Sequence, residues 1–148
     1  MKKFAASALL FLAFFFIPAV NYADDAEVIE WTQQTLLNTF SVGHDNIDQQ
    51  LAAVKNHYTN DAWQAMGSFF STGVNTIHTQ QLVLHPTLIT PAHLVDEGDY
   101  SGIHYWRINQ VMSIPEFNTT ISFSVVVIKA TNPPYLIQSL MMERTANE

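Results

Sequence analysis

The chain has 148 residues, of which 48% are hydrophobic and only 13% are charged. This length suits one domain, since domains commonly hold about 100–150 residues. Thirteen Asp and Glu against six Lys and Arg give a net charge of −7. That balance argues against nucleic-acid binding, because phosphates are neutralised by clustered cations. The absence of cysteine excludes disulfides, thiolate zinc sites and iron–sulfur clusters.

The first part of the chain has the pattern of an export segment. Lys2 and Lys3 precede an apolar run over residues 4–20, and Ala23 stands directly before an acidic pair. A short positive region, an apolar run and a small residue are typical of a secretory signal peptide, here residues 1–23. The alternative is an uncleaved membrane anchor, because 17 positions are at the short end of the roughly 17–25 residues that span a bilayer.

Both alternatives export the rest of the chain, residues 24–148, and the two lysines favour that orientation. Loss of residues 1–23 would remove two positive charges and no negative one, so the net charge would become −9. The remaining domain is acidic and large enough for one hydrophobic core. Because it has no cysteine, that core must supply its stability.

The first half of this domain has helical periodicity. Asp24 with Glu27 resembles a capping box, which predicts that the first helix begins there and continues until Gly43. A second helix is expected after residues 45–46, and residues 59–61 supply the cap of a third. The apolar residues that recur at helical spacing are Ile29, Leu36, Leu37, Phe40, Ile47, Leu51, Val54, Tyr58, Trp63, Met66, Phe69 and Phe70. Gly67 is interpreted as a close packing contact.

After Gly73 the helical period disappears and strand-like patterns follow. The alternation is clearest in 119–129, where odd positions are apolar and neighbouring positions carry serine. The expected elements are an extended stretch 77–89, a polar turn 96–102, strands 104–114 and 119–129, and a last strand 135–143 or a short helix around 140–142. Helices followed by consecutive antiparallel strands predict an α+β fold, with the N-terminal helices packed on one face of a curved sheet.

Several segments, in this order, resemble the DotI/IcmL family of inner-membrane components of type IVB secretion systems. The segment Tyr58–Trp63 is similar to the family's Tyr–Phe–Thr–x–x–Gly–Trp, with Ala62 at the glycine position. The others are Tyr105–Ile108, Ser124–Ile128 and the turn Asn132–Pro134. The resemblance extends from Glu27 to Arg144. It implies a cystatin-like, nuclear-transport-factor-like cone and a non-catalytic periplasmic scaffold subunit rather than an enzyme.

The histidines and nearby acids suggest two kinds of reactive site, and ordinary surface positions are the simpler interpretation. Four histidines lie in or between the predicted strands: His78, His85, His93 and His104. With Asp96 or Asp99 some of them could ligate zinc or copper, but no two have a tight ligand spacing, which favours surface histidines. The alternative function is a small-molecule-binding or enzymatic cone-fold protein that uses a cavity near His104 and Tyr105.

The sequence therefore predicts a periplasmic assembly or interaction module with no catalytic, cofactor-binding or metal-binding residues. Expected partners are secretion-complex subunits or copies of the chain itself, with no nucleic acid, and the membrane only through residues 4–20 if these stay uncleaved. Met141 and Met142 are expected either to pack the last strand against the core or to form a flexible, polarizable surface for contact with a partner. The aromatic residues expected to form a core rather than to stack on a ligand are Trp31, Trp63, Phe69, Phe70 and Trp106.

Overall fold

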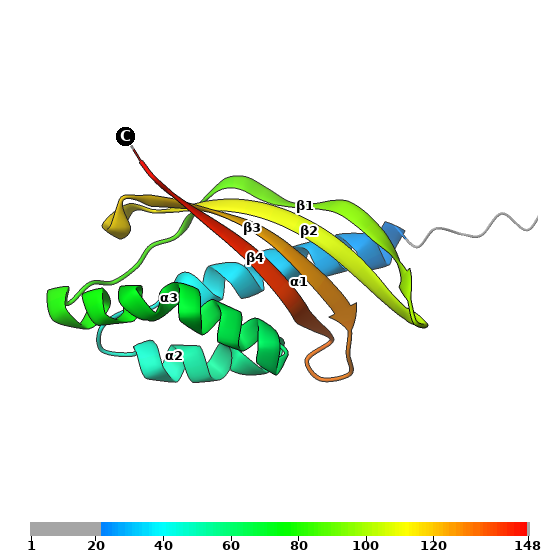
Figure 1. Cartoon of the computed structure of the whole chain (residues 1–148), viewed down its shortest axis with the longest axis horizontal. Coiled ribbons are helices and arrows are strands. Elements are labelled where there is room, and N and C mark those ends of the chain that lie inside the picture. Colours follow the sequence, from blue (N-terminus) through cyan, green and yellow to red (C-terminus); the bar gives the residue numbers. More distant parts are fainter. Residues whose placement is uncertain (1–21, 148) are drawn as a thin grey trace, which may run out of the picture.

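The computed structural model describes residues 22–147, so the apolar run 4–20 and its cleavage lie outside the described residues. Helices come first and strands follow, as predicted (Figure 1). The helices are α1 (Tyr22–Phe40), α2 (Ile47–Val54) and α3 (Asn60–Gln80), with short 3-10 turns η1 (Lys55–His57) and η2 (Pro115–Phe117). The strands are β1 (Thr87–Tyr100), β2 (Ile103–Ile114), β3 (Thr119–Lys129) and β4 (Tyr135–Ala146).

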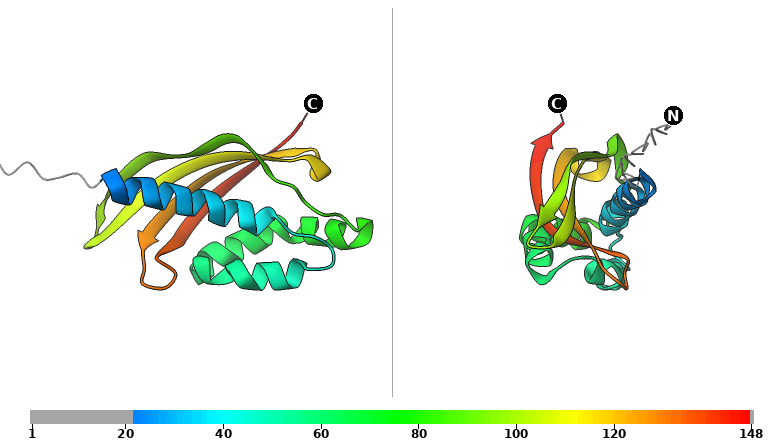
Figure 2. Two further views of the ribbon diagram at one scale, coloured as in Figure 1. Left: turned by 180° about the vertical axis from the view of Figure 1, so that it is seen from behind. Right: turned by 90° about the vertical axis from the view of Figure 1, so that its right-hand side faces the viewer.

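The four strands form one antiparallel sheet in the order β1-β2-β3-β4, which leaves β1 and β4 as its edges. The sheet is curved, and the three helices all lie on one side of it (Figure 2). Helix α1 runs along the sheet, α2 contacts α1, and α3 lies close to β4. The predicted α+β architecture with helices on one face is confirmed, and the sheet is open rather than closed into a barrel.

The core lies between the helices and the sheet because β2 and β3 turn alternate apolar residues toward α1. Phe40 of α1 makes edge-to-face contacts with Phe70 at 5.1 Å and with Phe123 at 5.5 Å between ring centroids. The aromatic-core prediction is confirmed, since Phe70 and Trp106 are buried and Trp31, Trp63 and Phe69 pack against the core. Met142 also packs there, whereas Met141 is 73% exposed.

Helix α3 begins as predicted but ends later than predicted. The Thr59 hydroxyl accepts a hydrogen bond from the Ala62 N–H at 3.4 Å, which is a standard N-cap. The helix then passes through Gly73 to Gln80, so the expectation of extended chain from residue 77 is wrong. Gly73 does not end the helix, because its missing side chain makes room for the rings of Phe70 and Phe117. By contrast, nothing approaches Gly67, and the close contact expected there is wrong.

The polar segment 96–102 is mostly strand rather than turn. β1 continues to Tyr100, and only Ser101 and Gly102, both with positive φ, connect it to β2. A two-residue turn of this kind matches the twist of the flanking strands, so both strands extend to the tip of the hairpin. The last segment is a strand, and the short helix considered for residues 140–142 is absent there.

Candidate functional site: the uncovered face of the sheet

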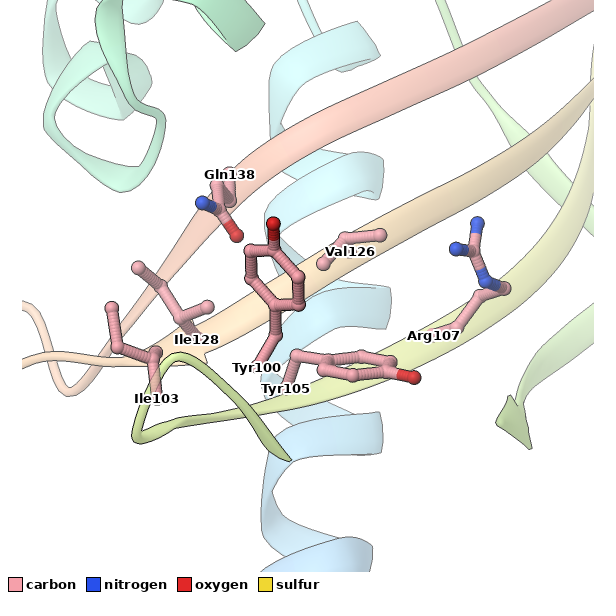
Figure 3. A pocket seen from close by; sticks show the side chains of 7 residues that line it. All are labelled: Tyr100, Ile103, Tyr105, Arg107, Val126, Ile128 and Gln138. Atoms are coloured by element: carbon pink, nitrogen blue, oxygen red, sulfur yellow. The ribbon is translucent and has the colours of Figure 1, made fainter. Parts of the chain in front are cut away.

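The side of the sheet away from the helices carries the residues that alternate with the core. Near the tip of the β1–β2 hairpin this face is apolar and hollowed, with a volume of about 320 Å³ (Figure 3). The residues that line the hollow are Tyr100, Ile103, Tyr105, Arg107, Val126, Ile128 and Gln138. Val126 and Ile128 come from β3, at register positions opposite Arg107 and Tyr105 of β2. All four strands thus contribute to the hollow, which gathers residues that are distant in sequence.

Tyr105 is held flat against the neighbouring strand. It lies opposite Gly98 in the β1–β2 register, where a Cβ atom would come within 3.3 Å of the ring. Its hydroxyl donates a hydrogen bond to Oδ2 of Asp96 at 3.2 Å. This hydrogen bond and the negative charge of Asp96 raise the pKa of Tyr105, so the phenol stays neutral. Glycine at position 98 therefore allows the close approach of the Tyr105 ring.

Gln138 reaches the hollow because β4 is irregular at that point. Val127 pairs with Ile137 and Val126 pairs with Ser139, which leaves Gln138 as an extra residue in β4. The bulge is held by Thr59, whose N–H donates to the Ile137 carbonyl and whose hydroxyl donates to the Gln138 carbonyl, both at 2.9 Å. The same threonine caps α3, so the helical corner and one wall of the hollow share a single residue.

Tyr58, the residue before Thr59, connects the start of α3 to α1 within the core. The Tyr58 hydroxyl lies 2.7 Å from Oγ1 of Thr39 on α1, in a buried environment. Burial raises the pKa of Tyr58 far above its ordinary value. Tyr58 and Thr59 therefore act in the architecture, linking α1, α3 and β4.

His104 and Tyr105 do not line one cavity, because Tyr105 lines the hollow and His104 does not. They are consecutive in β2 and their side chains point to opposite faces of the sheet. His104 faces the helix side, with its ring 4.6 Å from the ring of Trp106 and its nitrogens 3.4 Å from Asp99 and 3.5 Å from Glu97. The space between α1 and the sheet at Trp106 is filled by core side chains.

The other three histidines singled out in the sequence make separate contacts. His85 contacts Oε1 of Glu116 through Nδ1 at 2.8 Å, and His93 contacts the Pro91 carbonyl at 3.0 Å. His78 lies near the end of α3. Within residues 22–147, no group of three or more His, Asp or Glu side chains is placed to hold a metal ion. Asp96 is also separated from His104, because it bonds Tyr105 on the opposite face.

One polar side chain lies inside the core without a partner. Gln110 of β2 is fully buried, and neither its Nε2 nor its Oε1 is hydrogen-bonded among the described residues. Such a group costs about 1–3 kcal/mol relative to an apolar residue of similar shape. It was not singled out in the sequence, because it stands at an inward position between Ile108 and Met112 in an otherwise apolar pattern.

The start of α1 is tied to the sheet beside the hairpin. The Trp106 indole N–H donates to Oδ1 of Asp25 at 2.9 Å. Because α1 already includes Tyr22, Asp24 lies inside the helix and not at its cap, so the predicted capping box does not form the start of this helix. In the described part of the chain, no helix has the length and hydropathy required to cross a membrane.

Comparison with known proteins assigns the family. Residues 18–124 match the model of the DotI/IcmL family, described as a type IVb secretion system inner-membrane complex component. The chain belongs to this family. The predicted family is thus confirmed, and within Tyr58–Trp63 it is Thr59 that caps α3 and links it to β4. Among curated proteins, no sequence match was found.

Solved structures of a DotI periplasmic domain, a TraM fragment and an IcmL-like protein have a similar fold. The periplasmic domain of DotI aligns with a TM-score of 0.70 at 15% identity, covering 80% of this chain and 94% of that one. A periplasmic fragment of TraM gives 0.68 at 13% identity, covering 83% and 98%. An IcmL-like type IV secretion system protein from Legionella pneumophila gives 0.62 at 13% identity, covering 83% and 94%.

Sequence reasoning missed most of the hollow. The sequence predicts Tyr100 in a polar turn, and it marks Arg107 only within the segment Tyr105–Ile108 that resembles the family. The pattern Tyr–Ser–Gly–Ile at 100–103 was an available signal, because two turn residues between large side chains are typical of a tight hairpin. Gln138 had no such signal, since its position depends on a bulge in β4.

Proposed function

We propose that the chain is a non-catalytic subunit of a type IVB secretion inner-membrane complex, and that it contacts other envelope proteins through the uncovered face of its sheet. Family membership supports the assignment to a type IVB secretion inner-membrane complex. The fold, with helices on one face of a curved antiparallel sheet, supports grouping the domain with cystatin-like, nuclear-transport-factor-like folds.

The observation that carries this proposal is the apolar hollow on the face that no helix covers. Tyr100 and Ile103 line the hollow with 78% and 51% of their surface exposed, and Met141, 73% exposed, lies on β4 opposite Ser124. Exposed apolar groups gathered in one place commonly mark a protein or membrane contact. The hollow contains no arrangement of nucleophile, base and oriented acid, which favours binding over catalysis.

We further propose that residues 4–20 stay in the inner membrane and place the domain 24–148 in the periplasm. The family description as an inner-membrane component supports this arrangement over cleavage after Ala23. Intact mass of the chain isolated from the envelope tests it. Retention predicts the full 16.7 kDa, whereas a mass that starts at Asp24 would leave a free periplasmic domain.

Site-specific photocrosslinking in the native envelope tests the contact surface. A photoreactive amino acid is placed at Gln138, in the wall of the hollow, or at Gln49, an exposed glutamine on α2 that serves as the matched control. Adducts with envelope proteins or with a second copy are expected from position 138 and not from position 49. Equal yields from both positions, or none from either, would contradict the proposed surface.

A further inference from the structure

Helix α1 begins at Tyr22, directly after the apolar run 4–20 in the sequence, and its first turns lie at the same end of the described domain as the β1–β2 hairpin tip (Figure 1). The hydrogen bond between Asp25 and Trp106 holds the first turns of α1 beside β2, close to the β1–β2 turn. Figures 1 and 2 show the start of α1 and the tip of this hairpin at the same end, while the C-terminal end of α3 lies at the other end.

The hairpin tip presents two large side chains to solvent. Tyr100 and Ile103 flank the turn, with 78% and 51% of their surface exposed. The turn residues Ser101 and Gly102 have φ values of 52° and 78°, so the connection is as short as a hairpin allows. Because β1 and β2 remain paired up to Tyr100 and Ile103, both side chains are displayed on a rigid element.

We propose that this tip, through Tyr100 and Ile103, inserts into the interfacial region of the bilayer that holds residues 4–20. A tyrosine places its ring at the level of the lipid headgroups and keeps its hydroxyl hydrated, and an aliphatic neighbour adds apolar burial. The inference rests on retention of residues 4–20 in the membrane. It adds a second membrane contact, made by the folded domain itself, which would fix the orientation of the hollow relative to the bilayer.

The charges at this end make the contact apolar rather than electrostatic. Glu97 and Asp99 lie near the C-terminal end of β1 beside His104, and Asp25 lies in the first turn of α1. Anionic headgroups repel such carboxylates within about a Debye length. Insertion should therefore be stronger in phosphatidylcholine bilayers than in bilayers enriched in phosphatidylglycerol, opposite to the dependence of a polybasic membrane contact.

The absence of cysteine allows a site-specific test on the full chain. Ile103→Cys is labelled with an environment-sensitive NBD fluorophore and reconstituted in phosphatidylcholine vesicles. Val83→Cys is the matched control, because Val83 is 48% exposed and lies just beyond the end of α3, at the opposite end of the molecule. The label at position 103 should emit to the blue of the label at position 83. Lipids that carry a doxyl group near the headgroup should quench the label at position 103 at least twofold more strongly than the label at position 83.

Three results would overturn the proposal. Equal emission and equal quenching at both positions, in a chain that floats with the vesicles, would show an anchored domain whose tip stays in water. Shielding of position 103 only after envelope proteins are added would assign the tip to a protein partner. A chain that does not float would remove the anchoring on which the inference rests. The first result leaves both the anchoring and the contact surface tested at Gln138 intact. The second would support that contact surface, because Tyr100 and Ile103 line the same hollow as Gln138, and the third would also contradict retention of residues 4–20.

Discussion

The buried hydroxyl pair between α1 and the corner before α3 gives a sharp test of the hydrogen-bond assignment. The Thr39 hydroxyl lies 2.7 Å from the Thr35 carbonyl and 2.7 Å from the Tyr58 hydroxyl. A hydroxyl has one proton, and the Thr35 carbonyl can only accept. Thr39 therefore donates to Thr35, and Tyr58 must donate to Thr39. Thr39 is fully buried and Tyr58 is 5% exposed, so water cannot readily replace either partner.

The two single substitutions should have unequal costs. Thr39→Val keeps the side-chain shape but leaves the Tyr58 hydroxyl buried without an acceptor, which costs about 1–3 kcal/mol of unfolding free energy. Tyr58→Phe removes the donor itself and leaves Thr39 still bonded to Thr35, so the loss should be about 0.5–1.5 kcal/mol. The double variant leaves no orphaned hydroxyl. Its cost should therefore be smaller than the sum of the two, with a coupling energy of about 1 kcal/mol.

Urea unfolding, followed by tryptophan fluorescence, measures these differences. Trp63 is a convenient reporter, because its ring lies 5.4 Å from that of Tyr58. Thr32→Val is the matched control, since Thr32 is equally buried on α1 but its hydroxyl bonds only the Val28 carbonyl. It should lose less than Thr39→Val. A larger loss for Tyr58→Phe than for Thr39→Val, or equal losses at Thr32 and Thr39, would refute the assigned directions of donation.

Three further predictions concern pH, the buried amide and the glycines of α3. Burial and nearby acids raise the pKa of Tyr135 to about 12, and burial also raises the pKa of Tyr58. The stability that these two neutral phenols contribute is therefore fully present below pH 10 and decreases as the pH rises from 10 to 12. Unfolding at fixed urea against pH checks this, and Tyr58→Phe should flatten the fall. Gln110→Met should raise the unfolding free energy by about 1–3 kcal/mol in the same assay, and a decrease would mean that the amide has a partner. In thermal unfolding, Gly67→Ala should stabilise by about 0.4–1 kcal/mol because nothing lies near it, whereas Gly73→Leu should destabilise by about 1–3 kcal/mol through crowding; the opposite order would contradict the packing.

Local patterns in the sequence predicted several elements accurately. The alternation of apolar residues with serine placed β3 at residues 119–129, the same bounds that the structure has. Thr59 was included in the predicted cap of α3, and the family resemblance rested on the segment that begins beside it. These features succeed because a strand period and a helix cap depend on neighbouring residues alone.

Boundaries that depend on distant contacts were predicted less well. Gly73 was interpreted as the end of helical periodicity, but its neighbours across the fold include Phe117 from the η2 turn, which accounts for the glycine within a continuous helix. Asp96 and Asp99 were expected in a turn, yet pairing with β2 keeps them in the strand. A polar residue is tolerated in a strand when its cross-strand neighbour suits it, and that neighbour is not visible from local sequence.

The sequence by itself established an acidic chain with an apolar run at residues 4–20, and it predicted helices before strands and an aromatic core. Composition and periodicity suffice for this, because they set which residues must leave water and in what secondary structure. Only the tertiary structure decided that His104 and Tyr105 face opposite sides of the sheet. It also decided that Gln138 enters the hollow at a bulge, and that the β1–β2 tip lies beside the start of α1. These facts depend on strand register and on how layers pack, which are settled by contacts between residues far apart in the chain.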